Sequence, residues 1–290
     1  MAMFSKDENT ALLKFFRERD WVCPSSSCLE RIYFPLWHQV REWMKKSRPL
    51  LIGVAGGNGS GKSTMVTWLR QLLELNNVRA VSLSVDDFHL TQTERCQLSK
   101  TVHPLLQTRS AGTIDVTLMT DTLFQLLHLS NGDEITVPRF SKLMDDREPS
   151  DQWWSTRGPI DVILWEGFCI SSQAQSNDEI TVPVNRLESE QDPNCIWREF
   201  VNEQIKRMQL SFDWIDRLIY LSVDTFSEVI ANRARTEITM KNKLTNYTPM
   251  NQQSLACFLM QYQRMFQSQQ SRLPKVADYC VEAKLFSRQC

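Results

Sequence analysis

The chain has little of several features that would assign it to a specialised class. It contains only four histidines in 290 residues, and none shows the short histidine spacing typical of a zinc site. No apolar run approaches the roughly 18 residues of a membrane-spanning helix. Residues 1–21 have charges scattered through them and lack the apolar core and cleavage site of a signal peptide. We therefore expect a cytoplasmic protein with no membrane partner.

The chain also has no excess of charge of either sign. Lysine and arginine total 33 against 34 acidic residues, which gives a net charge of −1. A general nucleic-acid binder gains affinity by releasing counterions from phosphates, and that needs an excess of basic residues, so we expect no nucleic-acid partner. The eight cysteines include no C-x-x-C pair, which favours reduced thiols packed as small hydrophobic side chains.

From residue 49 onward, short apolar runs alternate with segments of helical period. The run over residues 50–55 is typical of a strand buried on both faces. Similar runs recur at 80–85, 162–165, 218–223 and, more weakly, 277–281. The segments with helical period are 62–75, 116–129, 197–208, 225–235 and 251–266. This alternation predicts an α/β fold with a parallel sheet flanked by helices.

Three other segments complete the expected organisation. Residues 1–48 look like a helical, amphipathic extension that precedes one domain over residues 49–290. Residues 140–159 and 171–195 show no clear period, so we expect two long loops. In the helical segment 251–266, the apolar and aromatic residues at helical spacing are expected in the core: Phe258, Met260, Tyr262 and Met265.

The sharpest motif directly follows the first apolar run and opens a helix. It reads GGNGSGKS and matches G-x-x-x-x-G-K-[ST], the phosphate-binding P-loop. Glycines let the backbone wrap around phosphate oxygens, and the helix N-terminus adds partial positive charge. Lys62 is expected to reach the β- and γ-phosphates of ATP, and Ser63 to bind Mg²⁺. The predicted nucleotide-binding residues here are Gly56, Gly57, Asn58, Gly59, Ser60, Gly61, Lys62, Ser63 and Thr64.

Two acidic segments follow other predicted strands. Asp86 and Asp87 come after the second strand and Glu166 ends the third, where ligands bind in open α/β sheets. Asp86 could accept the proton of an attacking hydroxyl and Glu166 could hold the shell of Mg²⁺. Neighbours on a strand point to opposite faces, so we expect only Asp86 to face the phosphates. Each acid alone could instead be a solvated turn residue.

Other branches of P-loop proteins fit the sequence less well. GTPases read guanine with N-K-x-D, whereas Asn242 and Lys243 are followed by Leu244 and Thr245. The signature loop of transporter ATPases is also missing. The arrangement of motifs therefore favours a small-molecule kinase.

These residues resemble the D-glycerate 3-kinases of plants and yeast and their bacterial relatives, within the phosphoribulokinase, uridine kinase and pantothenate kinase group. The resemblance runs from about residue 50 to the end. Its segments are SVDDFHLT at 84–91, TRSAGTID at 108–115, VPRFSK at 137–142, EGF at 166–168, PVNRLE at 183–188 and NRARTE at 232–237. His89 stands where the family has an aromatic residue, and Asn232 where it has tryptophan.

The resemblance implies a kinase that uses ATP and Mg²⁺, with Asp86 as base and Glu166 near the metal. It also implies a helical lid that brings Arg233, as a catalytic residue, and Arg235 over the phosphates. An acidic acceptor needs a cationic clamp, for which Arg109, Arg139 and Lys142 are candidates beside Asp87. We expect D-glycerate as acceptor. A nucleoside, pantothenate-like or sugar acceptor, or a nucleotide-binding regulatory protein without turnover, are the alternatives. Oligomeric state is left open.

Overall fold

The computed structural model describes residues 28–45, 49–243 and 248–283, together with residues 14, 17, 18 and 25. Its centre is a sheet of five parallel strands in the order β2-β7-β1-β8-β9. These strands are β1 (Leu50–Gly56), β2 (Ala80–Ser84), β7 (Val162–Gly167), β8 (Arg217–Ser222) and β9 (Tyr279–Glu282). Each coincides with a predicted apolar run, and the predicted α/β fold is confirmed.

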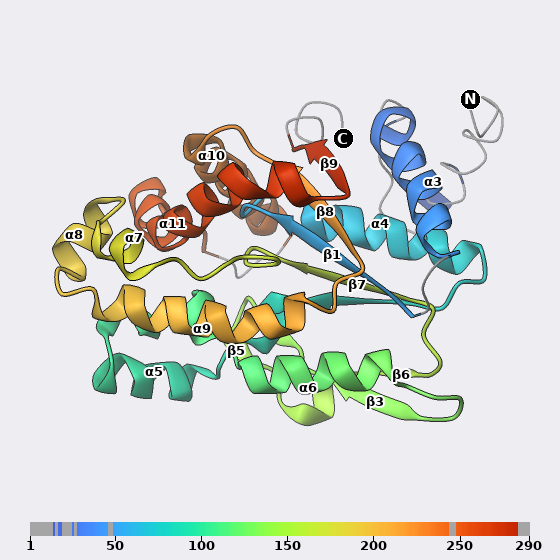
Figure 1. Ribbon diagram of the computed structural model, residues 1–290, viewed down its shortest axis with the longest axis horizontal. Helices are drawn as coiled ribbons and strands as arrows, with labels where there is room; N and C mark the ends of the chain where they lie inside the picture. Colours follow the sequence, from blue (N-terminus) through green and yellow to red (C-terminus); the bar gives the residue numbers. More distant parts are fainter. Residues whose placement is uncertain are drawn as a thin grey trace.

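Helices cover both faces of this sheet (Figure 1). The longer helices are α3 (Phe34–Trp43), α4 (Lys62–Leu75), α5 (Gln92–Thr101), α6 (Val116–Leu127), α9 (Ile196–Phe212), α10 (Phe226–Lys243) and α11 (Gln252–Val276). Residues of α3 and α4 pack on the face that holds Leu50, Ile52 and Val54. Residues of α6, α9 and α11 pack on the opposite face, against Leu51 and Ala55. Neighbouring residues of β1 thus enter two different cores because a strand points its side chains alternately.

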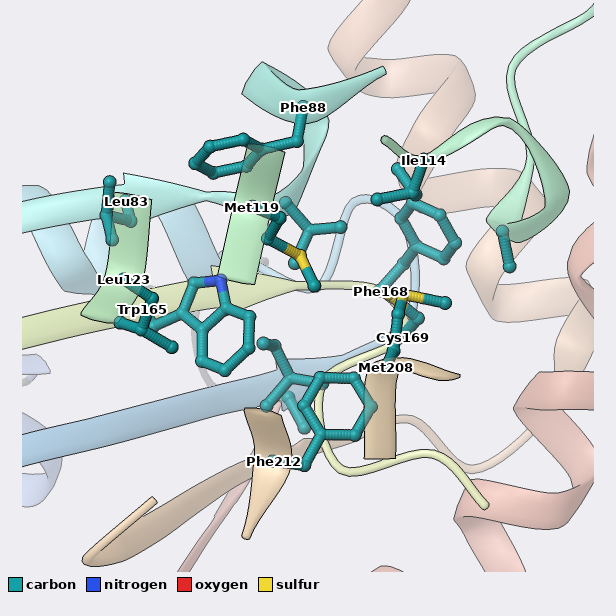
Figure 2. Close-up of a cluster of buried hydrophobic side chains, with 14 of the residues drawn as sticks. Leu83, Phe88, Ile114, Met119, Leu123, Trp165, Phe168, Cys169, Met208 and Phe212 are labelled. Carbon is teal, nitrogen blue, oxygen red and sulfur yellow. Dashed lines mark hydrogen bonds between the residues drawn. The ribbon is translucent and has the colours of Figure 1, made fainter. Parts of the chain in front are cut away.

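The second face carries the larger core (Figure 2). Trp165 of β7 is fully buried there and its ring centroid lies 5.4 Å from that of Phe212 in α9. Met119 and Leu123 of α6 belong to the same cluster. Phe168 and Cys169, which follow β7 directly, extend the cluster to the carboxyl edge of the sheet. The loop after β7 is therefore held by packing as well as by its strand.

The predicted extension is described from residue 28. A short π-helical turn (Leu29–Tyr33) leads into α3, and the ring of Tyr33 lies 4.2 Å from that of Trp68 in α4. Trp37 and Val40 share one core with the sheet. The boundary at residue 48 stays a prediction, and most of residues 1–27 lie outside the described residues.

Cys28 is disulfide-bonded, so the expectation of reduced thiols was wrong for this residue. The other described cysteines are free thiols, namely Cys96, Cys169, Cys195, Cys257 and Cys280. No helix among the described residues is long and apolar enough to cross a membrane.

The two predicted loops contain short elements that the sequence pattern did not reveal. Residues 134–157 form two small antiparallel ladders outside the main sheet. Their strands are β3 (Glu134–Val137), β4 (Phe140–Ser141), β5 (Asp146–Arg147) and β6 (Trp154–Arg157). The second segment contains helices α7 (Asn177–Thr181) and α8 (Arg186–Gln191). Elements of two to six residues are too short to show a hydrophobic period.

Polar contacts hold the second segment to the rest of the molecule. Arg198 of α9 lies fully buried and pairs with Asp192 at 2.9 Å. Arg264 of α11 reaches Glu188 of α8 at 2.6 Å. Both guanidinium groups also donate to backbone carbonyls of the segment. Such multiple bonds fix the arginine side chains, and they hold the segment that contains α7 and α8 against α9 and α11.

Candidate functional site

The P-loop lies at the carboxyl edge of the sheet, between β1 and α4. Gly61 adopts φ 96° at the start of α4, a left-handed conformation that favours glycine. Gly59 has φ 76°, and a Cβ atom there would lie 2.8 Å from the backbone nitrogen of Arg233 in α10. Glycine at position 59 therefore lets α10 lie directly against the loop. The Ser60 hydroxyl is buried without a hydrogen-bond partner.

Register in the sheet brings the acids to the same edge as the P-loop. Glu166 of β7 is paired with Val54 of β1 on one side and with Ser84 of β2 on the other. The Ser63 hydroxyl, at the start of α4, donates to Glu166 Oε1 at 2.6 Å. A hydroxyl and a carboxylate in contact are the donor pair that Mg²⁺ takes in P-loop enzymes. Ser63 and Glu166 thus fit a magnesium ion, as the sequence predicted, although their roles stay predictions.

Lys62 is buried in the same place. Its ammonium donates to the carbonyl of Gly57 at 3.1 Å. Burial lowers the pKa of Lys62, whereas the carboxylates of Glu166 and Asp86 act to raise it. Lys62 thus lies beside the loop and close to the carboxylates of Glu166 and Asp86, where it would meet phosphate oxygens.

Asp86 and Asp87 differ in surroundings, but for a reason other than strand alternation. That part of the expectation was wrong, because β2 ends at Ser84 and residues 85–88 form a 3₁₀ turn. The Ser84 hydroxyl accepts from the backbone N–H of Asp86 and caps the turn. Asp86 pairs with Lys142 at 2.7 Å. Asp87 instead accepts from the backbone N–H of Phe140 at 3.2 Å and so holds the start of β4.

The two carboxylates also have opposite pKa shifts. Burial acts to raise the pKa of Asp86, but the nearby Lys142, His89 and Arg109 outweigh it and hold this pKa well below its usual range. Burial raises the pKa of Asp87 to about 6, helped by the neighbouring Asp86. Asp86 is therefore the carboxylate that stays ionised throughout the neutral range.

These groups face one cavity of about 330 Å³. Its wall includes Asn58, Gly59 and residues 61–64 of the P-loop, and Asp86 and Glu166 at the strand ends. Cationic residues from three further segments join them, namely Arg109, Lys142 and Arg233. Such a concave, polar site with perturbed titratable groups is typical of an active site.

Some predicted site residues lie outside the wall of this cavity. Gly56, Gly57 and Ser60 of the P-loop, and Asp87 of the turn after β2, are not among the residues that line it. Arg139 is exposed, and its carbonyl accepts from the N–H of Glu148. Arg235 is exposed on α10 and donates to Asn232. Their predicted roles in binding stay predictions.

Aromatic residues complete the wall, although the sequence predicted core positions for Phe258 and Tyr262. Phe258 and Tyr262 lie on successive turns of α11, and Phe168 follows β7. The Tyr262 hydroxyl donates to the carbonyl of Arg109 at 2.7 Å, while its ring packs edge-to-face on Phe168. The helical spacing of Phe258 and Tyr262 is the same whether a helix faces a core or lines a cavity. No signal in the sequence could therefore separate the two.

His89 also lines the cavity, and its side chain is almost fully buried. Its Nδ1 lies 3.0 Å from the Thr113 hydroxyl, and its Nε2 lies 3.8 Å from Asp86 Oδ1. Burial lowers the pKa of His89 to about 3, assisted by Arg109 and Arg95 and opposed by Asp86. His89 is therefore neutral in the folded protein at neutral pH.

This burial makes a prediction about stability and pH. The pKa of His89 is lower in the folded chain than the 6.5 of the unfolded chain. The contribution of neutral His89 to the free energy of unfolding is therefore complete above pH 6.5. It is lost as the pH falls towards 3, by up to about 1.4 kcal/mol per pH unit. Denaturant unfolding should show that the free energy of unfolding falls less between pH 7 and pH 4 in His89→Gln than in the wild type. Parallel pH curves for the two proteins would contradict the prediction.

Comparison with known proteins agrees with this geometry. Residues 51–172 match the model of the phosphoribulokinase / uridine kinase family. A chloroplastic D-glycerate 3-kinase of Arabidopsis thaliana is 31% identical over 202 residues, which are 67% of this chain and 42% of the plant protein. The uncharacterized kinase mug58 of Schizosaccharomyces pombe is 28% identical over 208 residues, 69% of this chain and 74% of the yeast protein. This chain thus spans less than half the length of its plant relative.

A solved structure supports the fold. The D-glycerate 3-kinase of Cryptococcus neoformans superposes with a TM-score of 0.68 at 21% identity, over 86% of this chain and 96% of the fungal chain. The family match contains the P-loop, Asp86 and Glu166, the same three strand ends that form the cavity. Residues 51–172 thus match a phosphoribulokinase / uridine kinase family domain, and the chain has the fold of a P-loop kinase.

Proposed function

We propose that the chain is an ATP-dependent kinase that phosphorylates a hydroxyl of a small hydroxy acid, with D-glycerate as acceptor and 3-phosphoglycerate as product. One observation carries the proposal. A single cavity joins the P-loop cation Lys62, the Ser63–Glu166 pair and the ionised Asp86. Two similar proteins named D-glycerate 3-kinases support the choice of acceptor.

The donor side of the cavity suits the triphosphate of ATP. The P-loop backbone and Lys62 would bind the phosphates, and Ser63 and Glu166 would hold Mg²⁺. A bound magnesium ion would neutralise charge on the phosphate oxygens. Lys62, already buried beside the loop, would supply a fixed positive charge where negative charge builds up during transfer. Such preorganised charges are a large part of catalysis in phosphoryl transfer.

The acceptor side is centred on Asp86. Its Oδ2 is bound to Lys142 at 2.7 Å, so an acceptor hydroxyl can donate to Oδ1 or take the place of this ammonium at Oδ2. Phosphoryl transfer through a loose transition state needs positioning more than strong basicity. A carboxylate with a low pKa is therefore adequate, since it orients the hydroxyl and takes its proton late.

Arg233 is the cation expected to act mainly during transfer. It pairs with Glu237 at 2.5 Å, and its Nη1 is buried without a hydrogen-bond partner at the cavity wall. Arg233→Ala should lower kcat at least about tenfold, which is about 1.4 kcal/mol, while ATP binding changes less. Steady-state kinetics and ATP titration measure the two effects. Arg235→Ala, two residues further along the helix and exposed, is the comparison and should be milder. Equal losses in kcat and ATP affinity in Arg233→Ala would contradict the role.

A nucleoside acceptor is the second candidate. Phe168, Phe258 and Tyr262 line the cavity, and aromatic rings can stack on a base. An ATP-consumption screen over small hydroxy acids, nucleosides, sugars and pantothenate separates these possibilities. We expect turnover with D-glycerate above all other compounds. Higher turnover with a nucleoside than with D-glycerate would favour the second candidate. Absence of turnover with every acceptor would favour a regulatory nucleotide-binding protein.

The proposed cellular location is the cytoplasm. The Arabidopsis relative is described as chloroplastic. Localisation of the tagged full-length protein by microscopy tests this part of the proposal.

A further inference from the structure

The turn between β4 and β5 carries two opposite charges, of which Lys142 lines the cavity and Asp145 pairs with Arg109 of the cavity wall. Lys142 begins this turn and Asp145 ends it. Lys142 pairs with Asp86 at 2.7 Å, and Asp145 Oδ1 accepts from Arg109 Nε at 2.7 Å. One short turn thus supplies a donor to the predicted base and an acceptor to a cation of the cavity wall.

Arg95 of α5 is the second cation bound by Asp145. Its side chain is 0% exposed, and its Nη2 lies 3.0 Å from Asp145 Oδ2 and also donates to the Asp145 carbonyl. Nε and Nη1 of Arg95 are buried with no hydrogen-bond partner. Among the described residues, Asp145 is the one carboxylate within ion-pair distance of Arg95 or Arg109. A buried guanidinium with unmet donors needs an anion beside it.

The two guanidinium groups share one aromatic neighbour. The Cζ atoms of Arg95 and Arg109 lie 5.7 and 5.3 Å from the centroid of the Phe140 ring. Two like charges held on one ring repel each other unless an anion bridges them. The Asp145 carboxylate makes this bridge, one oxygen to each arginine.

The bridging carboxylate of Asp145 lies on a turn that is exposed to solvent. Asp145 is 46% exposed, and its neighbours Leu143 and Met144 are exposed apolar side chains. Its backbone has φ 51°, an uncommon conformation for a residue other than glycine. Asp145 is thus the solvent-facing member of both ion pairs. The arginines are therefore fixed, while their anion is the exchangeable member.

We propose that Arg95 and Arg109 form the subsite for the carboxylate of the acceptor, and that Asp145 occupies it until the acceptor binds. The proposal rests on the proposed function and adds the residues that bind the acceptor's carboxylate. The acceptor carboxylate takes the place of Asp145, and the acceptor hydroxyl takes the place of Lys142 at Asp86. Before the acceptor binds, Asp145 and Lys142 thus occupy the positions of the acceptor's carboxylate and hydroxyl. The free energy needed to displace them lowers the affinity for the acceptor.

Removing the internal anion should therefore tighten acceptor binding. We expect Asp145→Asn to lower the Kd of D-glycerate about 3- to 10-fold in calorimetric titration, because the competing carboxylate is gone. The Kd of ATP should change less than about twofold. Asp151→Asn is the matched control, since it removes the same charge from an exposed residue outside the cluster. Adding Arg109→Ala to Asp145→Asn should abolish the gain.

Two other results would overturn the subsite. An unchanged or higher Kd for D-glycerate in Asp145→Asn would show that Asp145 only supports the wall. If Asp145→Asn does not fold, Asp145→Ala is titrated instead, and misfolding of both would assign Asp145 a structural role.

Failure of the proposed function gives a different pattern. If the wild type does not phosphorylate D-glycerate, the same titrations are made with D-glycerate, glycolate and L-lactate in the absence of ATP. Tighter binding of one of these carboxylates by Asp145→Asn would support the subsite although the acceptor differs. Absence of binding to wild type and variant alike would overturn the subsite as well.

Discussion

Lys62→Ala should reduce phosphoryl transfer by about three orders of magnitude, which corresponds to about 4 kcal/mol of lost transition-state stabilisation. The ammonium is buried beside Gly57 and faces the cavity. Water would fill the space left by the truncated side chain, and water carries no fixed positive charge. Initial rates with saturating ATP and acceptor measure the effect.

The fold should survive this change. The pKa of Lys62 is lowered by burial, so its charged form is held at some cost and the alanine variant should unfold no more easily than the wild type. Lys206→Ala, on the exposed side of α9, is the control and should retain full activity. Turnover of Lys62→Ala within about threefold of the wild type would show that Lys62 does not act on the phosphates, because threefold is less than 1 kcal/mol.

Asp86→Asn should lower kcat about 100-fold or more while ATP still binds, the usual scale for a positioned general base. The amide keeps the shape of the side chain but cannot take a proton from the acceptor hydroxyl. It also loses the ion pair with Lys142, so kcat should be compared at saturating acceptor. Single-turnover rates and ATP titration separate the chemical step from binding.

Asp87→Asn provides the matched comparison, since it makes the same change one residue further along. Asp87 accepts a hydrogen bond from Phe140 and its pKa is raised to about 6. Its carboxylate is therefore easily neutralised, and the amide oxygen can still accept from the same N–H. We expect a smaller loss of kcat than in Asp86→Asn. A larger loss in Asp87→Asn would transfer the role of base to Asp87.

The sequence predicted the features that are local along the chain. β1, the P-loop and α4 form one contiguous segment, and the glycines at 59 and 61 have the positive φ angles that the motif requires. The apolar runs of β7 and β8 follow from burial on both faces. Because parallel strands end at one edge, the closeness of Glu166 and Asp86 to the P-loop could also be inferred.

The features that depend on distant residues could not be predicted. Arg95 and Asp145 are 50 residues apart and meet only through the two-residue strands β4 and β5. Neither residue belongs to a motif. Arg139 stood out because it belongs to the VPRF segment, yet its side chain is exposed while Phe140 beside it is buried. Which member of such a segment points inward is set by tertiary packing, and the sequence carries no separate signal for it.

The most direct test is to incubate the protein with ATP, Mg²⁺ and D-glycerate and to identify the phosphorylated product by phosphorus NMR. The account predicts 3-phosphoglycerate in amounts equal to the ADP formed, and an initial rate of product formation about a thousandfold lower with Lys62→Ala. Formation of ADP without any phosphorylated acceptor, or of a phosphorylated nucleoside in preference to a phosphorylated hydroxy acid in the same mixture, would contradict it.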